Sequence, residues 1–138
     1  MAKLSAGKTS GIADWLGIAA STACAVHCIV IPTLLITGTV LPATMFADES
    51  FHLAMLSVIL PAAIVAFGIG CWRHKDRRVL TLGAIGLTGI VLAATVLHDI
   101  AGETGERAVT VISAAILIAA HYRNFRLCRE LDCAHESG

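Results

Sequence analysis

Charged and aromatic side chains are scarce in this 138-residue sequence, and their scarcity limits the kind of protein it can be. Charged residues make up 14% of the chain and aromatic residues 5%, whereas 57% is apolar. A soluble domain is typically ~25% charged and ~45–50% apolar. Such a chain lacks the polar side chains to cover its own surface in water, so the composition predicts a membrane protein.

Several familiar sequence features are also missing. The basic residues form short islands without interleaved aromatics, and the formal net charge is zero, so we expect no nucleic-acid partner. No nucleotide-binding motif is present, and the five cysteines do not form a secreted disulfide pattern. The polar start, Met1–Ser10, is followed by a full-length apolar run rather than a short one with a cleavage site, so we expect no cleavable signal peptide.

Long apolar runs dominate the rest of the sequence. A helix needs ~20 apolar residues to cross a ~30 Å hydrocarbon core, and the last run falls slightly short of this. The predicted spans are about 14–36, 51–72, 79–98 and 108–122. They predict an all-α polytopic membrane protein with an N-terminal segment 1–13, a four-helix transmembrane domain 14–122 and a Cys/His-containing tail 123–138.

Individual residues shape these spans. Asp14 is expected at the water interface, where its carboxylate can stay hydrated. Pro32 should leave the carbonyl of Cys28 without its helical donor and kink the first span. Glycines that would let a neighbouring helix approach the third span closely are Gly83, Gly86 and Gly89.

The basic residues predict the orientation of the spans. Of the ten Lys and Arg residues, only Arg107 falls on the side of the first and third connections. The others lie in the start, the second connection and the tail: Lys3, Lys8, Arg73, Lys75, Arg77, Arg78, Arg123, Arg126 and Arg129. By the positive-inside rule, both termini are therefore predicted to be cytoplasmic, in a bacterial inner membrane.

The segment Cys24-Ala25-Val26-His27-Cys28 carries the chemistry of the first span. Positions i, i+3 and i+4 share a helix face, so Cys24, His27 and Cys28 can converge. Cys24 lies ~15 Å beyond Asp14, near the bilayer centre, where ionisable groups usually mark a pathway or site. Two thiolates and an imidazole suit Hg(II), Cu(I) or Zn(II), and thiolate exchange can bind and release such a cargo.

A purely structural interpretation of the same face remains open. Small residues spaced along it would suit close helix packing without any metal, because cysteine behaves as a small hydrophobe. They are Ala13, Gly17, Ala20, Cys24 and Cys28. Packing alone leaves a mid-membrane His27 between two cysteines unexplained.

A second group of possible ligands is predicted on the cytoplasmic side, where a metal ion could be handed to a cytosolic thiol. It comprises Cys128, Cys133 and His135 in the tail, with His121, Cys71 and His74 at the adjacent span ends. The spacing of Cys128 and Cys133 matches no tight zinc motif. An incidental pair of cysteines in a disordered tail is the alternative.

A third group is predicted on the outer side and could receive a cation. It comprises His52 and the pair His98-Asp99, with Asp48, Glu49 and Glu103 nearby. Ordinary interfacial histidines are the alternative interpretation.

Two stretches of the chain resemble a known family. Asp14-Trp15-Leu16-Gly17, leading into Cys24-Ala25-Val26-His27-Cys28 and Pro32, resembles the MerC mercury-resistance family of inner-membrane proteins. His98, the run His121-Tyr122-Arg123-Asn124-Phe125-Arg126-Leu127-Cys128, and Cys133 are similar to the end of the same family. The resemblance covers about Gly11 to His135.

The resemblance implies four spans, cytoplasmic termini and uptake of Hg(II) toward a cytosolic mercuric reductase. It implies that Cys24 and Cys28 are the transmembrane thiol pair and that Cys128 and Cys133 are the cytoplasmic pair. The histidines, which a purely mercuric carrier does not need, also suit Zn(II) or Cu(I).

The leading hypothesis is a metal-ion carrier rather than an enzyme, with a periplasmic metal donor and a cytosolic thiol acceptor as partners. It needs no permanent cofactor. One alternative is a haem-binding electron carrier with His52 and His98 as ligands. Another is a thiol oxidoreductase, although the outer connections carry no cysteine and a helical Cys-x-x-x-Cys makes disulfide geometry awkward. The last alternative is a structural or helper role without transport or redox chemistry of its own.

Overall fold

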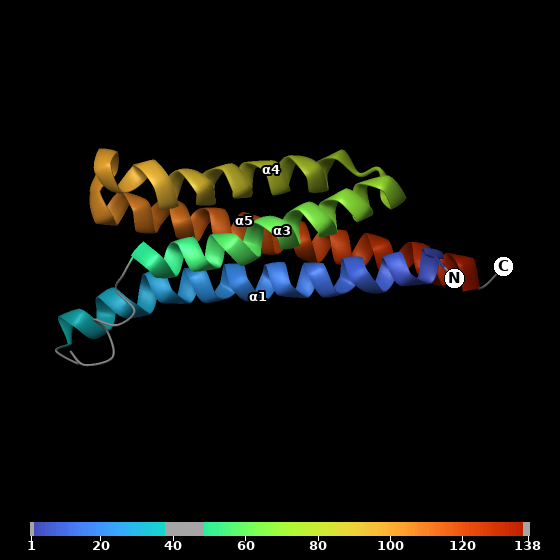
Figure 1. The fold of residues 1–138 in the computed structure, drawn as a ribbon, viewed down its shortest axis with the longest axis horizontal. Coiled ribbons are helices and arrows are strands. Elements are labelled where there is room, and N and C mark those ends of the chain that lie inside the picture. The colour runs from blue at the N-terminus through green and yellow to red at the C-terminus, as the bar shows by residue number, and fades with distance from the viewer. Residues whose placement is uncertain (1, 38–48, 137–138) are drawn as a thin grey trace.

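The computed structural model describes residues 2–37 and 49–136, and every regular element in these ranges is helical. The elements are α1 (Ala2–Ile36), α3 (Glu49–His74), α4 (Arg77–Leu92), the π-helical turn η1 (Ala93–Leu97) and α5 (His98–Glu136). The predicted all-α class is therefore confirmed for the described part of the chain. The helices lie side by side along one axis, and both chain termini lie at the same end of the bundle (Figure 1).

The chain reverses direction near Gly102. This residue, close to the start of α5, has φ +65° and ψ −179°, a conformation that favours glycine because it has no Cβ. As a result α5 runs back beside η1 and α4 (Figure 1). The reversal falls inside the predicted connection at 99–107 and defines what is called below the Gly102 end of the bundle.

The α3–α4 turn at the opposite end is held by Asp76. Its Oδ1 accepts a hydrogen bond from the backbone N–H of Arg78 at 2.8 Å and so caps the N-terminus of α4. Its Oδ2 accepts a hydrogen bond from Nη2 of Arg123, on α5, at 2.7 Å. A single carboxylate thus fixes the turn to a helix distant in sequence.

Among the described residues, three helical stretches are long and apolar enough to cross a membrane: Lys8–Leu34, Phe51–Gly70 and Arg77–Leu131. The last has 55 residues and contains the reversal at Gly102. Large apolar side chains point outward on all of them; examples are Ile12, Val26, Ile64, Ile85 and Ile112. An apolar exterior of this kind fits a lipid environment, so the composition-based prediction of a membrane protein is supported by the fold.

Small residues let the helices approach closely. The glycines predicted to allow this on α4 do so: a Cβ on Gly83 would meet the Phe67 ring, and one on Gly86 would meet Leu117. A Cβ on Gly89 would collide with the Ser113 side chain. The apolar core between the helices includes Ile59, Ala63, Ala66, Val79, Ile90, Ala114, Leu117 and Ala120.

Several predicted boundaries differ from the observed ones. Helix α1 begins at Ala2, so the segment 2–13 continues the first span as helix. Helix α5 continues to Glu136, so residues 123–136 form an extension of the last helix rather than a disordered tail. The predicted hydration of Asp14 is wrong: its side chain is completely buried, because partners on α5 replace water.

Candidate metal site

The two cysteines of α1 are buried on one helix face. Cys24 is 2% exposed and Cys28 6%, and their thiols contact each other directly. No disulfide joins them. The predicted stripe of small residues is confirmed, since Ala13, Gly17 and Ala20 are buried on the same face. Gly17 of this stripe faces His121 on α5, and the two buried sulfur atoms lie on the same face of α1.

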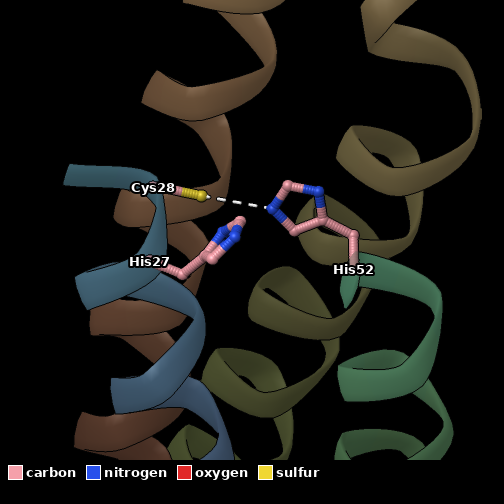
Figure 2. Close-up of side chains that lie close together, drawn as sticks. All are labelled: His27, Cys28 and His52. Atoms are coloured by element: carbon pink, nitrogen blue, oxygen red, sulfur yellow. Dashed lines mark hydrogen bonds between the residues drawn. The ribbon is translucent and has the colours of Figure 1, made fainter. Parts of the chain in front are cut away.

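A histidine from another helix meets this thiol pair. Nε2 of His52, near the start of α3, lies 3.3 Å from Sγ of Cys28. His27 lies beside them: its ring centre is 5.3 Å from that of His52, and the two rings are perpendicular (Figure 2). One ligand atom from each of His27, Cys28 and His52 falls within 4.8 Å of the others, a spacing that could hold one metal ion.

Phe51 fixes the position of His27. The two rings stack with centroids 4.0 Å apart and an interplanar angle of 18°. Because Phe51 and His52 are consecutive residues on α3, one turn of that helix both supports one imidazole and supplies the other. The cluster therefore depends on how α1 and α3 are aligned.

Glu106 extends the cluster toward the Gly102 end. Its Oε1 lies 3.3 Å from Nδ1 of His52, and its Oε2 lies 2.9 Å from Nδ1 of His98. The Glu106 side chain is 10% exposed, whereas that of His98 is 56% exposed. Cys28, His52, Glu106 and His98, called the polar relay below, thus connect the buried thiols to an accessible imidazole.

Sequence reasoning placed His52 and His98 in one outer group, and the relay joins them through Glu106. It missed Glu106 itself. The available signal was its position as the last acidic residue before the final apolar run. Glu103, which was included in that group, instead pairs with Arg107, one helical turn away on the surface.

The two members of the predicted cytoplasmic group whose side chains are described, His121 and Cys128, have different partners. His121 is completely buried and its Nδ1 lies 2.9 Å from Oδ1 of Asp14. Cys128 is buried beside Ser10, with Oγ and Sγ 3.9 Å apart. Predicted residues whose side chains lie outside the described ones are Cys71, His74, Cys133, His135 and Glu49; Asp48 lies wholly outside the described ranges.

The donor set indicates which chemistry the site can perform. Thiolate and imidazole ligands suit soft and borderline ions, while a carboxylate behind an imidazole orients that ring and raises its basicity. The arrangement does not favour haem between His52 and His98, because Nε2 of His52 is already in contact with Sγ of Cys28 at 3.3 Å.

The apolar helices define an all-helical membrane protein, and its buried cysteine–histidine cluster could hold a metal ion. The sequence profile described as MerC mercury resistance protein matches residues 14–126. The chain therefore belongs to the MerC family, which confirms the resemblance. The matched segment contains the whole relay but ends before Cys128 and Cys133. Comparisons with curated proteins and with solved structures gave no match.

Proposed function

We propose that this protein is an inner-membrane transporter that carries a soft metal ion, above all Hg(II), toward the cytoplasm. The observation that carries the proposal is the 3.3 Å contact between Cys28 Sγ and His52 Nε2. It joins a buried thiol pair to a polar relay that reaches the surface at His98. Membership of a mercury-resistance family supports Hg(II) as the cargo.

The proposed topology has four crossings with both termini in the cytoplasm. A continuous helix of 55 residues would be ~80 Å long, far more than the ~30 Å hydrocarbon core, so the reversal at Gly102 supports two crossings within Arg77–Leu131. The basic residues then lie on the cytoplasmic side, and the Gly102 end, with its histidines and acidic residues, faces the periplasm.

In the proposed route, a periplasmic donor delivers Hg(II) to His98 and Glu106. The ion passes to His52 and then to Cys28, whose thiol loses its proton as the mercury–sulfur bond forms. Cys24, in contact with Cys28, supplies the second thiolate and displaces the imidazole. An incoming thiol then removes the ion toward a cytosolic acceptor such as a mercuric reductase. In this route Cys128 and Cys133 bind the ion on the cytoplasmic side before the acceptor takes it.

Zn(II) or Cu(I) is the second candidate cargo. The observation that favours it is the presence of two imidazoles, from His27 and His52, within ligand distance of Cys28. Imidazole is a common ligand for these ions, whereas Hg(II) is satisfied by two thiolates.

Uptake of radioactive Hg(II), Zn(II) and Cu(I) into proteoliposomes tests the proposal. Cys24→Ala and Cys28→Ala should each abolish uptake of the cargo, because neither remaining thiol can complete a two-sulfur site. The matched control is the double substitution Ala23→Cys and Cys24→Ala, which keeps the number of thiols but moves one to an exposed neighbouring position. It should stay inactive. Normal uptake in this variant or in both single variants would refute the route.

A further inference from the structure

A basic and aromatic surface lies where the start of α1 meets the end of α5, and the proposed route does not use it. Trp15 on α1 is 60% exposed, and its ring meets that of Phe125 on α5 edge to face, with centroids 6.1 Å apart. The guanidinium of Arg129 lies 5.6 Å from the centroid of the Phe125 ring, in a cation–π contact. One phenylalanine therefore connects an exposed indole to an exposed cation across two helices.

A contact between the helices fixes the register of this surface. Gly11 on α1 faces Phe125, whose ring lies 3.6 Å from the position that a Cβ on Gly11 would occupy. Both termini lie at this end of the bundle, so α1 and the end of α5 run in opposite directions (Figure 1). The turn before Gly11 is therefore level with the turn after Phe125. This places Lys8 and Arg129, both exposed, at the same level on neighbouring helices.

Lys8 and Arg129 carry charges that the described part of the protein does not neutralise. Neither side chain forms an ion pair with a described residue. By contrast, the exposed Arg126 pairs with Glu130 on its own helix at 3.4 Å. Two positive charges at one level are therefore available to an external anion.

Apolar surface continues from these charges toward the middle of the bundle. Ile12 is 63% exposed and Leu16 51%, on the same helix as Trp15. Tryptophan favours the boundary between the hydrocarbon core and the headgroups. Lys8 lies ~10 Å from Trp15 along α1, enough to cross a polar interfacial layer of ~5–8 Å. With the indole at the hydrocarbon edge, the charges therefore lie at the level of lipid phosphates.

We propose that this surface binds one anionic phospholipid of the phosphatidylglycerol type. Lys8 and Arg129 hold its phosphate from two helices, Trp15 lies beside its glycerol region, and its acyl chains follow Ile12 and Leu16. A zwitterionic headgroup is disfavoured because its cation would lie next to two positive side chains. The apolar strip next to the charges favours a lipid over an acidic segment of a soluble protein. The bound lipid joins the start of α1 to the end of α5.

Quenching of Trp15 fluorescence by lipids with brominated acyl chains tests the proposal. The measurement uses Trp72→Phe, which removes the second tryptophan at an 88% exposed position. The protein is reconstituted in phosphatidylcholine vesicles that contain a small fraction of brominated phosphatidylglycerol or, separately, the same fraction of brominated phosphatidylcholine. The anionic lipid should quench Trp15 more strongly, because each nearby basic residue raises its association constant about fivefold. Equal quenching by the two lipids would overturn the proposal.

Substitutions separate a defined site from general charge attraction. Lys8→Gln and Arg129→Gln, in the same background, should each lower the relative association constant for phosphatidylglycerol about fivefold. The matched control is Arg78→Gln, which removes an exposed positive charge at the start of α4, at the same end of the bundle. It should keep the selectivity of the parent protein. An equal loss in all three variants would show general attraction to the membrane surface and refute a site between α1 and α5.

Melting temperatures in detergent distinguish a lipid from other anions. Phosphatidylglycerol added to the micelles should raise the melting temperature of wild type more than that of Lys8→Gln/Arg129→Gln, since a ligand that binds the folded state stabilises it. Inorganic phosphate and soluble polyglutamate should raise neither. Stabilisation by either one that equals the effect of the lipid would show a phosphate site or a docking site for an acidic polypeptide, and would overturn the proposal. Neither measurement uses a metal ion, so the result is independent of the proposed transport.

Discussion

Replacing Glu106 by glutamine should weaken metal capture without dismantling the thiol pair. Each Glu106 oxygen contacts one histidine, at 3.3 Å for His52 and 2.9 Å for His98. A glutamine has one acceptor oxygen and no charge, so one of the two rings loses its partner and neither retains a charged one. His52 thereby loses the carboxylate charge that orients its ring with Nε2 toward Cys28.

The size of the effect follows from the role of Glu106 behind a ligand. Removing a carboxylate that supports a metal-binding imidazole typically lowers metal affinity by ~10–100-fold. We therefore expect the KM for Hg(II) uptake in proteoliposomes to rise by ~10–100-fold in Glu106→Gln. The maximal rate should change much less, because Cys24 and Cys28 remain in contact.

Glu103→Gln is the matched control, because Glu103 is an exposed carboxylate on the same helix that pairs with Arg107 one turn away. An exposed pair of this kind contributes ~0–1 kcal/mol, so uptake should match wild type. Equal KM values for Glu106→Gln and wild type would refute the idea that the polar relay delivers the ion. A loss of uptake equal in both variants would point to general charge attraction at the Gly102 end.

Three further expectations can be tested on the same protein. Gly17→Ala should lower the melting temperature, since its Cβ would collide with His121 and overpacking costs ~1–3 kcal/mol; Gly68→Ala, with nothing within 4 Å of the new Cβ, should not. Gly102→Ala should also destabilise, by ~1–2 kcal/mol in chemical denaturation, because φ +65° disfavours a Cβ. In intact cells, a membrane-impermeant maleimide should label Gly102→Cys but not Lys75→Cys, and the reverse pattern would invert the proposed topology.

The sequence was sufficient to predict the helices and the surfaces that pack. Apolar run lengths predicted α-helical spans, and the spacing of Gly83, Gly86 and Gly89 predicted the close approach of other helices to α4. Both signals are local: they depend on residues three or four positions apart in one helix. The stripe containing Cys24 and Cys28 could be recognised for the same reason.

The contacts between helices could not be predicted in this way. Asp14 is buried because His121, 107 positions away, supplies its partner, and no local pattern in the sequence indicates that pairing. His52 meets Cys28 because the start of α3 lies beside the turn of α1 that carries Cys28. Glu106 reaches His98 only because the chain reverses at Gly102, which brings residues eight positions apart into contact across a turn.

The wide turn η1 has a consequence for anyone who shortens this chain. A π-helical turn contains one residue more than an α-helical turn, and it lies immediately before His98. Deleting a single alanine at position 93 or 94 would remove the extra residue and restore regular α-helix, so the following segment would keep nearly the same direction relative to α4. The same deletion in the regular part of α4 would instead turn the imidazole of His98 by ~100°, while every ligand remained in the chain.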